Sequence, residues 1–531
     1  MDQKFLHIGR AQDLQHLGDR RLYRALEMLP GFLLWATLLG AIIFSFITPV
    51  WVAIFILIFD VYWLVNAFYL ALFVILSFTR MRRAIRTSWT AELEKLDPKT
   101  FRVPALTSWR DVVHLVILPM YQEGAEIIGP ALQALAVSRY PKENLIVVLA
   151  TEIRAGYQAQ STAAALHKRF KNSFGAMLVT AHPDNLPGEI AGKGSNETWA
   201  AKKAVATYIN PHRIPNTRVV VSSFDSDTQI YPQYFECLTW HYLTAPSPLR
   251  SSFQPIPLFH NNVWEAPFFS RVAATGSTIW QLFMQGNPDI LETFSSHSMS
   301  LAALIEAGYW NTRVVSEDSI IFSQCFLAFN GDYRVVPLYY PVSMDANAAH
   351  SFWRTAANVY KQNRRWAYGV EKIPYALFGF TKNKKIPLFK KVRVSARLLF
   401  GFWAWACASL LIVFLGWLPL RIGGAQFNAT VLAFTLPELT SRLLTYALFG
   451  LFVNGALTFL LLPPRPAHIS RTAYASLLFQ WLFLLPNLIV FSALPAIEAQ
   501  TRLMCGKYLG FFVTEKTRRT HPRPTNKQPP G

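Results

Sequence analysis

The hydrophobic pattern changes along the chain, from long unbroken apolar runs near both ends to short ones in the middle. Residues 28–79 carry a single charge, Asp60. A membrane-spanning helix needs about 20 apolar residues, so this stretch is long enough for two. Thr48-Pro49 is the natural division, because proline favours a turn or a helix start. The pattern therefore predicts a helical hairpin.

Three more apolar runs follow the middle of the chain. They cover Leu398–Leu420, Leu443–Leu462 and residues 472–497, the last of which contains Pro486 and Pro495. The first two have about the length of a spanning helix. The pattern predicts an α-helical membrane region that resumes near residue 393.

Basic residues border these runs. They are Arg20, Arg21 and Arg24 before the first run, Arg80, Arg82, Arg83 and Arg86 after the second, and Arg465 and Arg471 before the last. Basic residues stay on the cytoplasmic side of a membrane, so both ends of the hairpin and the middle of the chain are expected in the cytoplasm. A fifth full crossing would carry the basic tail outside. Residues 472–497 are therefore expected to form an interfacial or re-entrant helix broken near Pro486.

The middle of the chain has the pattern of a globular α/β domain. The strand-like segments "VVHLVILPMY", "NLIVVLAT" and "RVVVSSFDSD" alternate with helical segments, which predicts a largely parallel sheet. Ligands of such sheets lie at the carboxyl ends of the strands. The predicted division is an N-terminal segment 1–28, a transmembrane hairpin 29–79, an α/β domain 80–392, C-terminal membrane and interfacial helices 393–497, and a terminal segment 498–531.

Composition supports a membrane protein and narrows its partners. Hydrophobic residues make up 52% of the 531 residues and charged residues 15%, against roughly 25% charged in soluble domains. The net charge is +20. Because much of this charge flanks the apolar runs, membrane lipids are the expected partner and nucleic acid is not. A multi-pass protein of the inner cell membrane with a cytoplasmic domain is expected.

Two acidic pairs could carry chemistry. Asp225 and Asp227 follow a strand in "VVVSSFDSDT", and in an extended chain they would face the same side. Together they could hold a hard divalent cation against a diphosphate, or they could form an ordinary polar loop. Glu317 and Asp318 in "VVSEDSIIF" open a predicted helix. One could be a general base, or both could simply stabilise the helix start.

A third segment, "YKQNRRWAYG", contains Gln362, Arg364, Arg365 and Trp366. Arginine grips phosphate oxygens through two donors, and tryptophan offers a flat apolar face to a sugar ring. The alternative is a helix on the membrane surface whose basic residues face lipid headgroups.

The order "PMYQE", DxD, acidic pair and QxxRW resembles the family 2 glycosyltransferases, specifically the membrane-embedded branch with cellulose and hyaluronan synthases. The resemblance covers about residues 112–372. "FFVTEK", residues 511–516, is similar to the FxVTxK gating-loop motif of cellulose synthases. The resemblance implies a GT-A-type glycosyltransferase domain combined with an α-helical transmembrane region.

The same resemblance implies roles for individual residues. Donor-binding positions would be Pro119, Tyr121, Glu123, Glu152, Lys193, Asp225, Gln362, Arg365, Thr514 and Lys516, with Asp225 and Asp227 on the metal, Asp318 with Glu317 catalytic, and Trp366 toward the acceptor. The implied cofactor is Mg²⁺ or Mn²⁺. The sequence departs from the family where Glu152 replaces the aspartate that usually reads the nucleobase, and where Ser316 opens the acidic motif in place of threonine.

The implied reaction is inverting transfer of a sugar from a nucleotide-sugar donor, first of all a UDP-sugar, to a glycan or lipid-linked acceptor. Processive polysaccharide synthesis and single transfer to a glycolipid share this chemistry. A transporter is the alternative from another class, to which Asp60 gives slight support, but it leaves about 300 globular residues unexplained. A catalytically dead regulator is opposed by the motif residues that are present.

Overall fold

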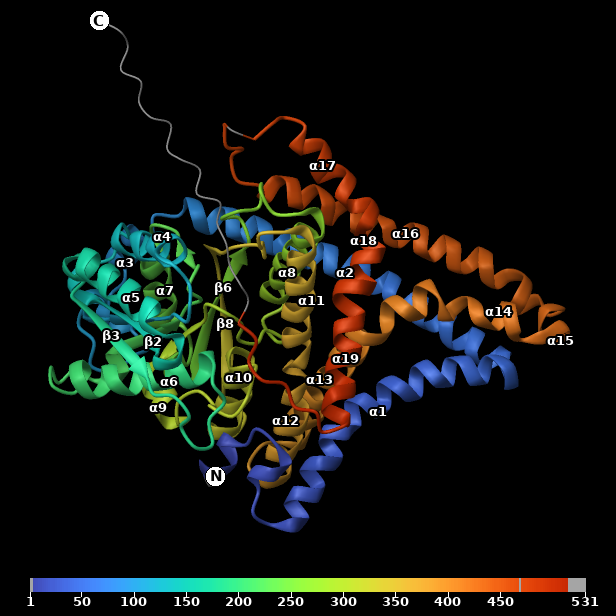
Figure 1. The fold of residues 1–531 in the computed structure, drawn as a ribbon, viewed down its shortest axis with the longest axis horizontal. Coiled ribbons are helices and arrows are strands. Elements are labelled where there is room, and N and C mark those ends of the chain that lie inside the picture. Colours follow the sequence, from blue (N-terminus) through green and yellow to red (C-terminus); the bar gives the residue numbers. More distant parts are fainter. Residues whose placement is uncertain (1–2, 468, 514–531) are drawn as a thin grey trace, which may run out of the picture.

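The α/β domain is built on one mixed eight-stranded sheet. The computed structural model describes residues 3–467 and 469–513 (Figure 1). The strand order is β3-β2-β1-β4-β7-β6-β8-β5. The strands are β1 (Val113–Pro119), β2 (Leu145–Glu152), β3 (Ala176–His182), β4 (Val219–Ser223), β5 (Gln229–Ile230), β6 (Ser251–Leu258), β7 (Ser298–Ser300) and β8 (Arg334–Ser343).

The predicted parallel pairing holds for four of the seven strand pairs in this sheet, one of which joins β6 to β8. Strands β3, β2, β1 and β4 are parallel neighbours, whereas β7 runs antiparallel between β4 and β6. Strand β1 alternates between two cores: Leu115 and Ile117 face one, and Val116 and Leu118 face the other. Both faces are thus buried, which explains why the strand is a continuous apolar run.

Helices cover both faces of the sheet, and further helices connect the α/β domain to the membrane region. They are α3 (Trp89–Glu94), α4 (Ala125–Ala136), α5 (Tyr157–Phe170), α6 (Lys193–Ala204), α7 (Tyr234–Thr244), α8 (Phe268–Gly286), α9 (Leu301–Glu306), α10 (Glu317–Ala328), α11 (Phe352–Ala367) and α12 (Lys372–Lys382). Helices α4, α5 and α7 pack in the core that contains Val116, and α6, α9 and α10 in the core that contains Leu115. The predicted helix start at Glu317 is confirmed.

The apolar runs form long helices. Helix α1 (Leu17–Ile47) and helix α2 (Pro49–Arg86) divide at Thr48, as predicted. Within the described residues, four helical segments are long and apolar enough to cross a membrane: α1, α2, α13 (Leu388–Val413) and Ala473–Met504. Helices α14 (Leu418–Ile422) and α15 (Gly424–Asn428) lead to α16 (Val431–Leu461), which packs along α2. The expected combination of an α/β domain with a helical membrane region is confirmed.

The last apolar run is helical but irregular. Its regular parts are α17 (Ala473–Phe479), α18 (Leu484–Leu488) and α19 (Leu494–Met504). A 3₁₀ turn at Gln480–Phe483 and a π turn at Ile489–Ala493 flank the part that contains Pro486. The expected irregularity near Pro486 is therefore present. The 32 residues of Ala473–Met504 are long enough to cross a membrane, so the re-entrant path stays a prediction.

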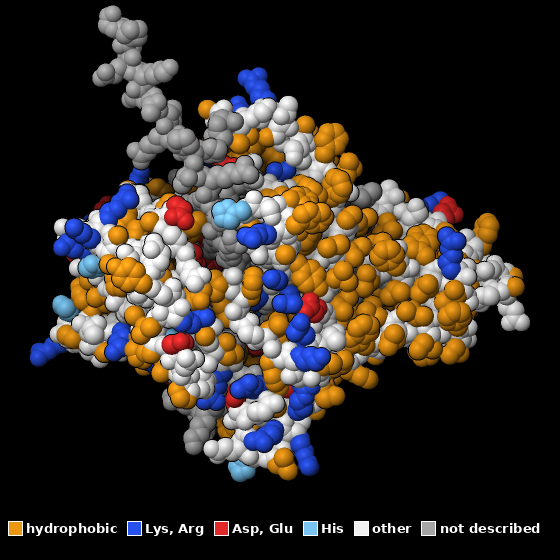
Figure 2. Space-filling model, viewed as in Figure 1, with side chains coloured by type: hydrophobic (Ala, Val, Ile, Leu, Met, Phe, Trp, Pro, Cys, Tyr) orange, Lys and Arg blue, Asp and Glu red, His pale blue; other side chains and the backbone are white. Residues whose placement is uncertain are grey.

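The two structural regions differ in surface character. Figure 2 shows hydrophobic side chains crowded over the helical side of the molecule and lysines and arginines scattered over the rest. Helix α19 runs beside α1 and α11 (Figure 1). Arg24 of α1 donates to the backbone oxygens of Leu503 and Met504. The first membrane helix therefore holds the chain where it leaves α19, next to the α/β domain.

Candidate active site

The DxD residues lie in a turn beyond β4. The strand ends at Ser223, and the amide of Thr228 donates to the backbone oxygen of Asp225 at 2.9 Å. The expectation that both carboxylates share one side of an extended strand is therefore wrong, because the chain has already turned. Asp225 accepts from the Ser295 hydroxyl at 2.7 Å, and Asp227 accepts from the backbone N–H of Asp345 at 2.9 Å.

Lys193 joins the DxD turn to the acidic pair. Its ammonium lies 2.7 Å from Asp225 Oδ1 and 2.9 Å from both carboxylate oxygens of Asp318. The side chain of Lys193 is 8% exposed, while those of Asp225 and Asp318 are 27% and 21% exposed. Three predicted residues from separate motifs thus meet at the carboxyl end of β4. The carboxylates of Asp225 and Asp318 are partly open to solvent.

Two glycines allow this close packing around Lys193. A Cβ atom on Gly192 would lie 2.7 Å from Cβ of Phe511, and a Cβ on Gly194 would lie 2.9 Å from Cβ of Glu317. Distances below 3 Å are not tolerated without movement. The sequence "GKG" at the start of α6 therefore lets the acidic pair and the C-terminal segment approach Lys193.

Burial and neighbouring charges set the protonation states of this cluster. Burial alone would lower the pKa of Lys193, but Asp225, Asp318, Glu197 and Glu317 raise it well above its usual value, so the ammonium stays charged. Burial raises the pKa of Glu317 strongly and that of Glu197 to about 8. Burial therefore favours the neutral form of both glutamates.

Another acidic residue, Asp345, adjoins the DxD turn. Asn261, which follows β6, donates to the backbone oxygen of Asp227 at 3.1 Å and to the carboxylate of Asp345 at 2.8 Å. Sequence reasoning missed Asp345 and Asn261, because neither belongs to a recognisable motif. The only indication in the sequence was that both are polar residues just after strands, where ligands of such sheets bind.

The QxxRW helix, α11, divides its side chains among different surroundings. Gln362 and Trp366 line a small cavity together with Asp345. Arg365 lies with its guanidinium carbon 4.7 Å from the ring centre of Phe511. Arg364 donates to Glu498 of α19 at 2.6 Å, so it holds α11 against that helix and does not face the site.

The ends of β1 and β2 form another part of the site. Pro119 ends β1, and Glu123 accepts from the Tyr121 amide at 2.7 Å and from the hydroxyl of Ser226, inside the DxD turn, at 3.1 Å. Glu152 accepts from Arg154 at 2.5 Å, and the Arg154 guanidinium lies over the Tyr121 ring. Arg154, which sequence reasoning missed, thus neutralises the residue expected to read the base.

The C-terminal segment reaches the site as far as it is described. Phe511 lies between Gly192 and Arg365, and Lys361 lies over the ring of Phe512. Thr514 and Lys516, the expected donor contacts of the gating motif, lie outside the described residues. The position of Phe511 nevertheless places the start of this motif next to Lys193.

Glu371, missed by the sequence analysis, anchors the acidic pair. One oxygen of this buried carboxyl accepts from the amides of Val315 and Ser316, both at 2.9 Å, and from the Ser316 hydroxyl at 2.7 Å. These donors immediately precede Glu317 and Asp318. Burial raises the pKa of Glu371 to about 7 against the opposing effect of its donors.

We expect Glu371→Ala to lower kcat at least about tenfold with little change in donor KM, because a small misplacement of a catalytic group is costly. Glu371→Gln retains an oxygen that can accept the same hydrogen bonds and should keep most of the rate. Steady-state kinetics on folded protein would measure both. Equal loss in the two variants would assign the effect to charge and not to anchoring.

Comparisons with known proteins give structural likenesses only. No family model and no curated protein sequence matches the chain. The mannosyltransferase PcManGT from Pyrobaculum calidifontis, in complex with GDP-Man and Mn²⁺, is similar at 13% identity and a TM-score of 0.39, over 85% of this chain and all of that one. S. aureus TarS 1-349 in complex with UDP-GlcNAc is similar at 12% identity and a TM-score of 0.35, over 65% of this chain and 90% of that one. TM-scores below 0.5 do not establish a common fold, so the activity must be judged from the site.

Proposed function

We propose that this chain is a membrane-embedded glycosyltransferase of the GT-A type that transfers a sugar from a nucleotide-sugar donor, first of all a UDP-sugar, with inversion. The observation that supports it most is the Lys193 ammonium between Asp225 and Asp318. The cluster combines a cation suited to a diphosphate with a partly exposed carboxylate suited to a proton transfer. An inner-membrane location with the α/β domain in the cytoplasm fits the arginines that border the membrane helices.

The residues present fit a hard divalent cation. Asp225 and Asp227 lie in one turn, and the backbone N–H of Asp345 holds the Asp227 carboxylate. Carboxylate oxygens suit Mg²⁺ or Mn²⁺ better than zinc, and the cation would take the place that the Lys193 ammonium holds at Asp225. Glu197, Glu317 and Asp318 also have oxygens within 4.8 Å of one another, and the Lys193 ammonium contacts this group as it contacts Asp225. When bound at Asp225 and Asp227, the cation would neutralise charge on the diphosphate leaving group.

In the proposed reaction, Asp318 accepts the proton of the acceptor hydroxyl, and that oxygen attacks the anomeric carbon opposite the departing diphosphate. Lys193 and Arg365 stabilise the negative charge that develops on the leaving group. Because Lys193 holds both oxygens of Asp318, its movement toward the diphosphate would also free the base. Trp366 and Gln362 border a small cavity beside Asp345, and we propose that Trp366 faces the acceptor and Gln362 the donor.

Donor binding tests this assignment without requiring a known acceptor. Lys193→Met should weaken binding of UDP with Mn²⁺ by about tenfold to a hundredfold, because a charge-assisted contact to phosphate is lost. Lys202→Met, on an exposed position of the same helix, is the matched control. Titration calorimetry on the full chain measures both. Equal affinity in the two variants would remove Lys193 from the donor site.

The C-terminal segment is proposed to close over the bound donor and exclude water. Removal of the chain after residue 510 should cut turnover strongly without unfolding the protein, since it deletes Phe511 and the whole FxVTxK-like motif. A chain ended after residue 517 keeps the motif and is the control. Lys516→Ala should raise donor KM or lower kcat. Full turnover by the shorter chain would make the motif a chance match and would favour single-sugar transfer over polymer synthesis.

The proposed chemistry suits two classes of acceptor, a growing polysaccharide and a lipid-linked acceptor. Processive extension of a polysaccharide is favoured by the position of Phe511 beside the site. Single transfer to a lipid-linked acceptor requires no closing segment. Product size, measured on chains made from a labelled donor, separates the two.

A further inference from the structure

The cytoplasmic end of α2 carries a basic hollow that the proposed reaction does not use. Its volume is about 500 Å³, and it shares no lining residue with the Lys193 cluster. The residues that line it are Phe78, Thr79, Arg82, Arg83, Arg86 and Thr87. Arg82 and Arg86 are four residues apart, so they lie on one face of the helix.

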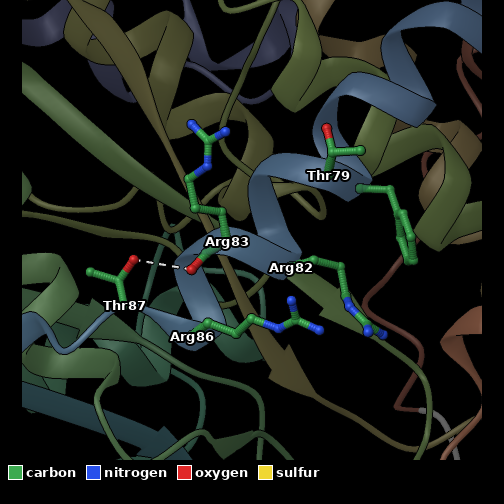
Figure 3. A pocket seen from close by; sticks show the side chains of 6 residues that line it. Thr79, Arg82, Arg83, Arg86 and Thr87 are labelled. Atoms are coloured by element: carbon green, nitrogen blue, oxygen red, sulfur yellow. Dashed lines mark hydrogen bonds between the residues drawn. The ribbon is translucent and has the colours of Figure 1, made fainter.

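The arginines of this face lack acidic partners within the described part of the chain. Figure 3 shows Arg82 and Arg86 extended to the same side of α2, with Arg83 directed away from them. Like charges at i and i+4 repel. Helix α13 shows the usual remedy, since Arg393 pairs with Asp289 and Arg397 with Glu292. At the end of α2 the charge is left for an external anion.

The position of the hollow along α2, relative to the apolar part of the helix, indicates that the anion is a lipid headgroup. Helix α2 has 38 residues, about 57 Å at 1.5 Å per residue, whereas a bilayer core is about 30 Å thick. Its exposed apolar side chains Leu72, Ile75 and Leu76 end about half a turn before Phe78, where the hollow begins. Six residues separate Leu76 from Arg82, about 9 Å along the helix. Acyl chains beside the leucines would thus place a headgroup at the arginines.

We propose that this hollow binds the phosphate of one anionic phospholipid headgroup, with Arg82 and Arg86 as the principal donors. Arginine provides paired N–H groups that match phosphate oxygens. Phe78, whose ring lies beneath the Arg82 guanidinium at 5.9 Å, supplies an apolar wall for the glycerol end of the lipid. The site is independent of the proposed transfer reaction.

The test uses the full chain in neutral phosphatidylcholine nanodiscs that contain a trace of photoactivatable phosphatidylglycerol. Crosslinks should map to the peptide around residues 78–87, and unlabelled phosphatidylglycerol should compete while phosphatidylcholine and inorganic phosphate should not. Arg82→Gln with Arg83→Gln and Arg86→Gln should reduce crosslinking at least about tenfold, since each arginine contributes to headgroup attraction.

A variant with the same loss of charge controls for general electrostatics. Lys168, Arg169 and Lys171 are exposed on the α/β domain, around the end of α5, and their replacement by glutamine should leave crosslinking unchanged. The position of the crosslinks is measured on wild-type protein, so this part of the test does not depend on whether a variant folds. The proposal is overturned if crosslinks scatter along all membrane helices, if phosphatidylcholine or inorganic phosphate competes equally, or if both variants lose the same amount.

Discussion

Asp318→Asn should lower the rate of sugar transfer by about 10²- to 10⁴-fold, the usual cost of losing a general base. Asparagine keeps the shape of the side chain but cannot take the acceptor proton. Donor binding should change little, because Lys193 retains Asp225 as a partner. Initial rates with a labelled nucleotide sugar, together with donor affinity from calorimetry, measure the two effects separately.

The neighbouring Glu317 offers a matched control. Burial raises the pKa of its carboxyl well above the usual value, which favours the neutral form before substitution. Glu317→Gln should therefore retain far more activity than Asp318→Asn. Asp332→Asn, at an exposed residue paired with Arg250, should have no effect. Near-normal turnover in Asp318→Asn, or a greater loss in Glu317→Gln, would remove Asp318 from the role of base.

Removal of divalent cations should stop the reaction. In the proposed reaction a hard cation stabilises the charge on the departing diphosphate, and Asp225 with Asp227 would supply the oxygen ligands that Mg²⁺ and Mn²⁺ prefer. Protein treated with EDTA should regain activity when Mg²⁺ or Mn²⁺ is added in excess, and zinc should not substitute. Asp225→Asn should raise the concentration of Mn²⁺ needed for half-maximal rate.

A second readout separates metal binding from turnover. Mn²⁺ and UDP together should raise the melting temperature more than either alone, since a ligand that binds only folded protein stabilises it. Asp227→Asn should reduce that increment, and Asp332→Asn should not. Full activity in excess chelator would contradict the metal assignment.

The sequence allowed prediction of those features that depend on local pattern. The helix division at Thr48, the buried strands that precede the motifs and the start of α10 at Glu317 follow from periodicity and turn chemistry. The meeting of Lys193, Asp225 and Asp318 was predicted only through the resemblance. Parallel strands bring their carboxyl ends to one edge, but they do not specify which side chains touch there.

Other features depend on tertiary contacts that no local pattern reveals. The turn at Asp225–Thr228 replaces the expected extended geometry because Asp227 is held by the Asp345 amide, 118 residues further along. Glu371, which follows the QxxRW helix in the sequence, accepts a hydrogen bond from Ser316, 55 residues earlier. Arg154, which belongs to no motif in the sequence, neutralises Glu152. The contacts of Asp227 and Glu371 join elements distant in the chain, and each partner could have been many other residues.

The most direct measurement of the proposed function is transfer itself. Purified full-length protein in nanodiscs is incubated with UDP- and GDP-sugars labelled on the sugar, and both the released nucleoside diphosphate and the labelled product are quantified and sized. The account predicts that at least one donor yields nucleoside diphosphate and glycosylated product in equal amounts, with Mg²⁺ or Mn²⁺ required and Asp318→Asn inactive. Absence of transfer from every donor to any glycan or lipid acceptor, or equal product from the Asp318→Asn protein, would contradict it.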